Sequence, residues 1–350
     1  MTRRWLRYAL PATLVLVGLA IWQRWYIAYL TQAGLGQAKL LWNTRPIADV
    51  LRDPKVATTT RHKLELVQQA KEFAITKLGL HPSRSYTTFA DIGAGPVSYA
   101  LTACPAERLE YYRWWFPVVG WVPYLGFFHK ALAEEAEQDM QRRGYDTDVR
   151  EVPAYSTLGW FADPVTSPML RYGDHDIVAT IIHELTHGTL YLPGQGDFNE
   201  SLANLIGMRG AIEFYCARNS ADCSTARQSW ADTLAFAGFI DQLYHRLDQV
   251  LSQPGDRSSK LEAKARFMAT VPAEFAAWQE KQARKIYARF GKRKLNNAVI
   301  LSLYLYYRHL RLFEEAYQHR HVNLKEFLTE VRQAVTGAAD PIAAVQSLAR

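Results

Sequence analysis

The stretch IIHELTH, from Ile181 to His187, decides how this chain of 350 residues is interpreted. It places the pattern H-E-x-x-H inside an apolar segment with helical spacing. Residues four apart on a helix lie on the same face, so His183 and His187 can direct their imidazole nitrogens at one metal ion. Glu184 lies beside them, where its carboxylate can take a proton from a metal-bound water. Two His ligands with a Glu base are typical of zinc-dependent metalloproteases.

The motif also has a plainer interpretation, an amphipathic helix with two ordinary histidines. Chance would produce the pattern in on the order of a few per cent of chains with this histidine content. The flanking and inner positions Ile182, Leu185 and Thr186 are uncharged, as expected of a helix that is buried around a metal. We therefore predict a metal site here.

A third metal ligand follows the motif. A catalytic zinc takes three protein ligands and leaves a position for water. The His of a metzincin is excluded, because Leu190 and Pro193 stand where that class has Gly and His. Glu200 opens a second helical pattern, with twelve residues (188–199) between it and His187, several of them turn formers that allow the chain to reverse. We predict that Glu200 faces the two histidines and completes the zinc site.

Asp197 offers alternatives to this assignment. It is a rival ligand, ten residues after His187. Asp197 and Glu200 also resemble a capping box, with Asp197 as the N-cap of the second helix. We expect Glu200 to be the ligand, and Asp197 to be a cap or to support the ligands from behind.

An edge strand is predicted upstream of the metal helix. Residues 152–161 are rich in aromatic and β-branched types and are bounded by Pro153 and Pro164. Such a strand can bind a peptide substrate as an added strand. Gly159 would admit the substrate backbone, and Tyr155 would stabilise the oxyanion of the scissile carbonyl. Alternatively, these aromatic residues only fill the core.

Several sequence blocks follow one another along the chain. They are WFPVVG from Trp115, YLGFF from Tyr124, AYSTLGWFADP from Ala154, HELTH from His183, FNES from Phe198 and LNNA from Leu295. Together they resemble the predicted bacterial aminopeptidase family of HExxH zinc metallopeptidases, which is gluzincin-like. The resemblance covers nearly the whole chain.

The resemblance implies a zinc peptidase with His183, His187 and Glu200 as ligands and Glu184 as base. The aminopeptidase label rests on the resemblance alone, and an endopeptidase is not excluded. Asp163 is the acid within the strand block that could hold a substrate α-ammonium group. A metal-binding structural or interaction protein that is tethered to a membrane and lacks turnover is the alternative function. The presence of Glu184 disfavours it.

The N-terminus has a basic start followed by an apolar run. Family members usually carry a lipoprotein Cys after the signal sequence, but residues 16–20 contain none. The cleavage site is poor and the run is barely long enough to span a bilayer. We predict an uncleaved transmembrane signal anchor over residues 1–30, with a single catalytic domain, residues 31–350, on the periplasmic or extracytoplasmic side. A cleaved signal peptide and a buried N-terminal helix are the alternatives.

Composition favours one ordered body, since 49% of the residues are hydrophobic and no linker is evident. Apolar spacing predicts helices over residues 33–51, 58–78, 129–143, 225–251, 260–290 and 295–319, and strands over 147–161 and 166–170. The expected fold is a mostly helical α+β domain, with the zincin-like metal helix beside a small mixed sheet.

Cysteines and charge add little to the function. Cys216 and Cys223 could form a small disulfide in an oxidising compartment, leaving Cys104 as a buried thiol. The net charge is 41 − 34 = +7. The basic cluster within residues 281–294 matches no base-reading motif, so no nucleic-acid partner is expected. The cluster is interpreted as a solvated helix face, or alternatively as a surface for anionic lipid headgroups.

Overall fold

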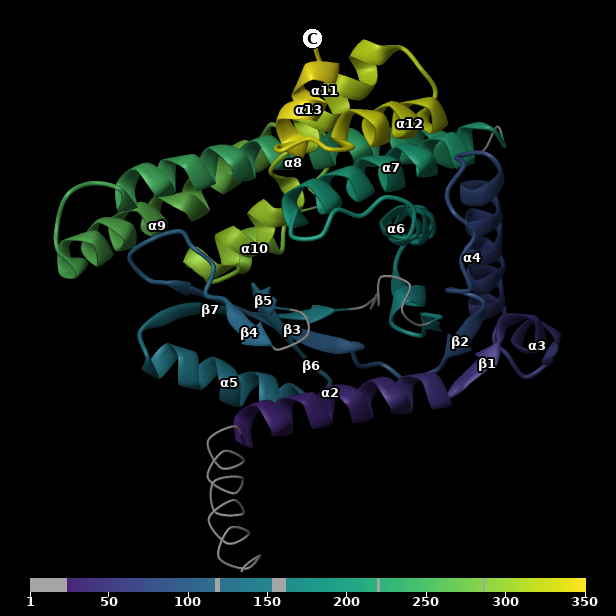
Figure 1. The fold of residues 1–350 in the computed structure, drawn as a ribbon, viewed down its shortest axis with the longest axis horizontal. Coiled ribbons are helices and arrows are strands. Elements are labelled where there is room, and N and C mark those ends of the chain that lie inside the picture. Colours follow the sequence, from purple (N-terminus) through teal and green to yellow (C-terminus); the bar gives the residue numbers. More distant parts are fainter. Residues whose placement is uncertain (1–23, 117–119, 153–161, 219–220, 286) are drawn as a thin grey trace, which may run out of the picture.

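The computed structural model describes residues 24–116, 120–152, 162–218, 221–285 and 287–350, and shows a mostly helical α+β fold (Figure 1). The helices are α2 (Arg24–Trp42), α3 (Ile47–Arg52), α4 (Thr58–Thr76), α5 (Lys130–Arg142), α6 (Asp174–His187), α7 (Gly196–Cys216), α8 (Asp222–Leu251), α9 (Arg257–Glu280), α10 (Asn297–Tyr307), α11 (Leu310–Arg320), α12 (Leu324–Val335) and α13 (Pro341–Leu348). Two short 3₁₀ helices are η1 (Met169–Arg171) and η2 (Phe290–Lys292).

The strands form small separate sheets. They are β1 (Thr44–Pro46), β2 (Thr88–Ala90), β3 (Ser98–Pro105), β4 (Trp114–Phe116), β5 (Gly120–Val122), β6 (Tyr124–Phe127), β7 (Tyr145–Val152) and β8 (Val165–Thr166). The sheet β6-β3-β7 is antiparallel, β4 pairs with β5, and β1-β2-β8 is mixed because β2 and β8 run parallel. In place of the predicted small mixed sheet, the described part of the chain therefore has three small sheets, of which β1-β2-β8 is mixed.

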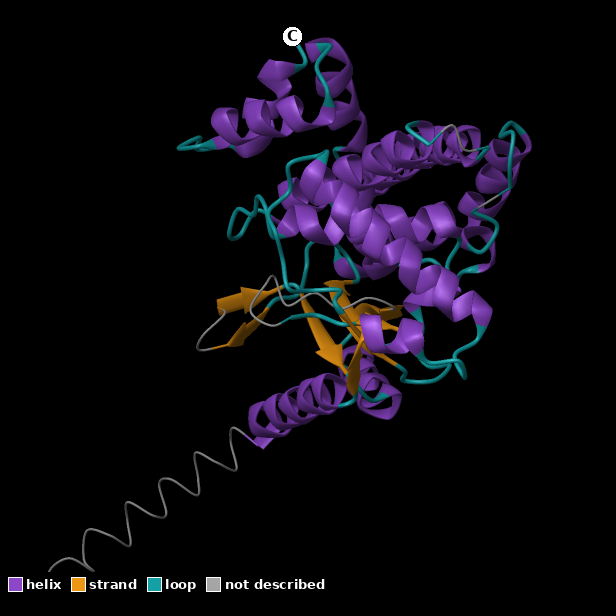
Figure 2. Ribbon diagram, turned by 90° about the vertical axis from the view of Figure 1, so that its right-hand side faces the viewer, coloured by secondary structure: helices purple, strands orange, loops and turns teal. Residues whose placement is uncertain are grey.

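The strands lie between two groups of helices (Figures 1 and 2). Helices α2 and α5 cover one side, and α7 to α13 form the larger layer on the other side. Strand β7 lies at the edge of its sheet in the described part of the chain, and it shares only Val152 with the edge strand predicted over residues 152–161. Residues 153–161, the rest of the predicted strand, fall outside the described residues. The second predicted strand is shorter than expected, because β8 is followed directly by η1.

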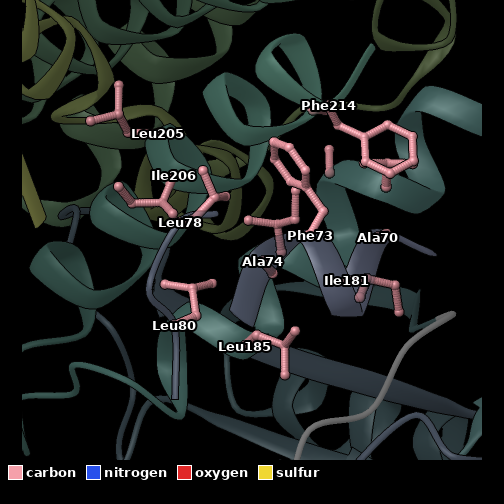
Figure 3. Packing of buried hydrophobic residues seen from close by; sticks show 14 of the residues in the cluster. Ala70, Phe73, Ala74, Leu78, Leu80, Ile181, Leu185, Leu205, Ile206 and Phe214 are labelled. Atoms are coloured by element: carbon pink, nitrogen blue, oxygen red, sulfur yellow. The ribbon is translucent and has the colours of Figure 1, made fainter. Parts of the chain in front are cut away.

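Helix α6 is buried between α4 and α7 by its apolar positions. Ile181, Ile182 and Leu185 are almost fully buried, and Figure 3 shows two of them among side chains of α4 and α7 such as Phe73 and Phe214. Fully burying a side chain of this size stabilises the fold by about 1.5–3 kcal/mol. This packing holds α6, the helix that carries the H-E-x-x-H motif, in place. The opposite face of α6 is turned toward the sheets.

Three predicted helix boundaries are wrong for reasons of tertiary packing. The helix predicted over residues 33–51 is split into α2 and α3, because the chain extends at β1 to pair with β2. The helix predicted to end at residue 290 ends at Glu280, and the chain then turns so that Phe290 packs against Phe275. The helix predicted over 295–319 breaks near Arg308, whose side chain pairs with Asp197 of α7.

The predicted membrane anchor is mostly outside the described part of the chain. Helix α2 carries residues 24–30 of it, and residues 1–23 are not described. Among the described residues, no helix combines the length and the apolar character needed to cross a bilayer. Cys216 and Cys223 are joined by a disulfide between the end of α7 and the start of α8, and Cys104 is a buried free thiol, as predicted.

Candidate metal centre

Helix α6 places both histidines of the motif on one face at its C-terminal end. The helix begins at Asp174 and ends at His187, with Gly188 as C-cap. The Nε2 atoms of His183 and His187 lie 3.1 Å apart, so the two rings converge on one point. His187 is 7% exposed, and the spacing of one helical turn therefore produces a paired, largely buried set of imidazoles.

Helix α7 brings the carboxylate of Glu200 to the same point. Its Oε2 lies 3.6 Å from Nε2 of His183, and its Oε1 lies 3.7 Å from Nε2 of His187. The neighbouring Asn199 accepts a hydrogen bond from the Leu192 amide and donates one to the Leu192 carbonyl, each 2.8 Å long. These two bonds tie the loop after α6 to the first turn of α7. The chain reversal expected from the turn formers is thus present, with Glu200 facing the histidines.

The capping role predicted for Asp197 is wrong. Helix α7 begins at Gly196 with Gln195 as N-cap, so Asp197 lies inside the first turn. Its carboxylate pairs with the guanidinium of Arg308 instead. Asp197 therefore pairs with the residue that follows α10 and does not cap α7.

The three side chains fit a zinc ion in donor type and spacing. The candidate ligand atoms of His183, His187 and Glu200 all lie within 4.8 Å of one another. Tetrahedral zinc with bonds of about 2.0–2.1 Å has ligand atoms about 3.3 Å apart. The measured separations of 3.1, 3.6 and 3.7 Å lie close to that value. Two imidazole nitrogens and a carboxylate oxygen are also a common catalytic zinc donor set.

The protonation tendencies of the three groups differ. Burial, together with the charge of His183, lowers the pKa of His187 to about 4, so this imidazole is neutral at pH 7. Burial alone would lower the pKa of His183, but the nearby carboxylates of Glu200 and Glu184 raise it above its usual value. Burial would raise the pKa of Glu200, yet the two histidines and Arg150 lower it. A neutral His187 and an ionised Glu200 are the states that bind a metal.

A residue behind the ligands was missed by sequence reasoning. Asn204 lies one turn after Glu200 on α7, and its side chain is close enough to His183 to help raise the pKa of that imidazole. The same side chain donates to the backbone carbonyl of Tyr306 on α10, 3.0 Å away. Asn204 therefore connects α7 to α10 beside His183, where its polar side chain can help to orient the imidazole. The one-turn spacing from Glu200 was the signal that could have identified it.

A pocket of about 350 Å³ opens beside His183 and Glu184. Tyr306 lines it, and its hydroxyl accepts a hydrogen bond of 2.8 Å from Nη2 of Arg150 on β7. Burial raises the pKa of Tyr306; the charge of Arg150 lowers it, whereas the charges of Glu200 and Glu184 raise it further. Tyr306 is therefore a neutral hydroxyl at pH 7. Neither Arg150 nor Tyr306 was predicted, because no local pattern joins positions 156 residues apart.

The predicted strand residues Tyr155 and Gly159 lie outside the described residues, so their roles stay predictions. Asp163 is described and is 2% exposed. Its amide donates to Ser85 Oγ, and its carbonyl accepts from the Tyr86 amide. These bonds fasten the chain on its way into β8.

Comparison with protein families matches residues 28–340 to the Aminopep family, whose description is "Putative aminopeptidase". No curated protein and no solved structure matches the chain. The matched range includes α6, α7, β7 and α10, the elements that carry the cluster of His183, His187 and Glu200 with its neighbours. The chain belongs to the Aminopep family.

Proposed function

We propose that the protein is a zinc-dependent aminopeptidase that hydrolyses peptide bonds. The observation that carries the proposal is the triangle of His183, His187 and Glu200, with Glu184 next to it on the same pocket wall. The family adds the aminopeptidase class. The zinc dependence and the gluzincin-like roles of the residues are inferred from the donor set and its spacing.

Zinc held by these ligands would supply Lewis acidity, lowering the pKa of water and polarising a carbonyl group. Glu184 accepts the proton of the attacking water and then passes it to the leaving amine. Tyr306 donates its hydroxyl hydrogen to the carbonyl oxygen as negative charge develops there. Arg150 orients that hydroxyl from behind. The oxyanion role proposed for Tyr306 is the one that the sequence predicts for Tyr155, and the role of Tyr155 stays a prediction because residue 155 lies outside the described residues.

Replacing Glu184 by Gln tests the proposal. The variant should keep its zinc, because Glu184 is not a ligand, and should lose hydrolysis by about 10²–10⁴-fold. Zinc content is measured by elemental analysis and activity with free and N-terminally blocked peptides. Glu65→Gln, an exposed change on α4, is the matched control and should behave as wild type.

Four results would contradict the proposal. A wild-type protein that binds no zinc, or that is unaffected by a chelator, is not a zinc peptidase. A Glu184→Gln protein as active as wild type assigns the base elsewhere. Cleavage of blocked and free peptides at equal rates indicates an endopeptidase. Stoichiometric zinc without hydrolysis of any peptide would favour the metal-binding protein without turnover.

We also propose that residues 1–30 anchor the protein in a membrane, with the catalytic domain on the extracytoplasmic side. The basic and apolar N-terminal sequence supports this topology. The disulfide between Cys216 and Cys223 is also typical of an oxidising compartment. Protease treatment of intact spheroplasts tests the topology, since an extracytoplasmic domain would be digested and a cytoplasmic one protected.

A further inference from the structure

The pocket beside Glu184 extends along α6 toward the start of that helix. Asp176 lies seven residues before His183, which is two turns and about 10.5 Å along the helix axis on the same face. Both residues line the pocket, and Thr180 lies between them. The remaining wall is mostly apolar and includes Met169, Ile177 and Met208 (the last on α7). The pocket therefore has catalytic groups at one end, a carboxylate at the other and apolar walls between.

We propose that this pocket binds the side chain of a substrate's N-terminal lysine or arginine, with Asp176 as the residue that selects it. The inference rests on the proposed peptidase function and names the substrate class. The methylene groups of lysine or arginine would lie against the apolar walls, and the cationic end would pair with the Asp176 carboxylate.

The charge at Asp176 is available for a ligand. Its Oδ1 lies 3.0 Å from Nε2 of His175, and the Asp176 side chain is 47% exposed. Within the described ranges, no lysine or arginine lies at ion-pair distance from it. Asp176 also lies in the first turn of α6, where the helix dipole favours negative charge. A substrate cation would thus meet a carboxylate that no described lysine or arginine neutralises.

Length decides between the substrate groups that Asp176 could hold. An α-ammonium lies one bond from Cα, so with a hydrogen bond it reaches only about 4 Å. An extended lysine or arginine side chain reaches about 6 Å and, with the hydrogen bond, about 9 Å. The reach of about 9 Å is close to the distance of about 10.5 Å along α6 between the catalytic end of the pocket and Asp176. The pocket volume of about 350 Å³ also accommodates such a side chain.

The test compares aminoacyl-aminomethylcoumarin substrates on the full-length, zinc-loaded protein. Wild type should hydrolyse the arginine and lysine substrates with a kcat/KM at least about tenfold above that for leucine or norleucine. Asp176→Asn should remove this preference mainly through kcat/KM of the cationic substrates, and leave the apolar ones unchanged. Asp174→Asn is the matched control. Asp174 is in the same helical turn but pairs with His62 and Lys63 and does not line the pocket, so the preference should persist.

A binding measurement separates this inference from the proposed function. Calorimetric titration of the Glu184→Gln protein with L-argininamide and L-norleucinamide needs no turnover. The pocket assignment is supported if argininamide binds more tightly than norleucinamide and Asp176→Asn abolishes this difference. This result counts even if no peptide is hydrolysed. Equal binding of the two amides, an apolar preference, or an Asp176→Asn protein that matches wild type overturns it. A further result would also overturn the pocket assignment. If wild type releases the dipeptide from Ala-Ala-aminomethylcoumarin and Asp176→Asn does not, Asp176 binds the α-ammonium group of the substrate.

Discussion

Gly207 of α7 lies directly against His183 of α6. A β-carbon at position 207 would lie 3.0 Å from Cβ of His183 and 2.6 Å from the carbonyl oxygen of Ala179. The carbonyl belongs to the α6 backbone and cannot rotate away, so only glycine permits this approach of the two helices. Glu200 lies two turns before Gly207 on the same helix. The close contact thereby sets the distance between Glu200 and the two imidazoles.

Gly207→Ala should push α7 away from α6. We expect a loss of about 1–3 kcal/mol in the free energy of unfolding and weaker zinc binding, because overpacking displaces the helix that carries Glu200. Denaturant unfolding and competitive zinc titration measure the two effects. Gly34→Ala is the control, because Gly34 lies in α2 and a β-carbon there would have nothing within 4 Å of it. A Gly207→Ala protein with wild-type zinc affinity would show that this contact does not position Glu200.

Asn204→Ala should lower zinc affinity by about 10–100-fold without removing any ligand. The loss is expected because the variant lacks the polar side chain that lies beside His183 and can help to orient its ring. Asn204→Asp is the conservative variant for comparison with Asn204→Ala, because its carboxylate can still accept a hydrogen bond from the imidazole of His183. The expected order of zinc affinity in a chelator competition is wild type, then Asn204→Asp, then Asn204→Ala. Equal affinity of all three would remove Asn204 from the metal centre.

Local spacing was sufficient to predict the parts of the site that depend on a single helix. The one-turn separation of His183 and His187 guarantees a shared face once α6 forms. Glu200 was within reach of the same reasoning, because the turn formers before it permit a reversal. Asp197 was assigned wrongly because α7 begins two residues earlier than a cap at Asp197 requires, and helix ends are poorly fixed by sequence.

The opposite wall of the site depends on tertiary packing, and the sequence pattern contains no sign of it. Arg150 comes from the edge strand β7 and Tyr306 from α10. The break between α10 and α11, which ends the helix just after Tyr306, was also missed, because apolar spacing continues through it. Long-range pairing of this kind has no period along the chain. The pocket, and with it the role proposed for Asp176, therefore required the structure.

Tyr306→Phe should lower kcat by about 10²-fold while KM changes little, because its hydroxyl is proposed to act on charge that develops only in the transition state. Steady-state kinetics with a free peptide, combined with zinc analysis, measures this. Tyr304→Phe is the control on the same helix, since the hydroxyl of Tyr304 lies 3.4 Å from His245 and the residue lines a different pocket. Should Tyr306→Phe retain full kcat, a different group must stabilise the oxyanion.

The three cysteines should differ in reactivity in a way that thiol counting reveals. Burial raises the pKa of the Cys104 thiol to about 12, so at pH 8 only on the order of 10⁻⁴ of it is thiolate. The native protein should therefore react very slowly with Ellman's reagent. In denaturant without reductant one thiol should react, and after reduction three, because Cys216 and Cys223 form the disulfide.

Cys104→Ser provides the control for this count. Its denatured, unreduced form should show no reactive thiol, and reduction should release two. Three reactive thiols in unreduced, denatured wild type would contradict the disulfide. Rapid labelling of native wild type at pH 8 would contradict the burial of Cys104, because a thiol that is 0% exposed must wait for the fold to open before it reacts. Its labelling rate should then follow the free energy of unfolding and fall when zinc is added, since zinc that binds only the folded protein stabilises it.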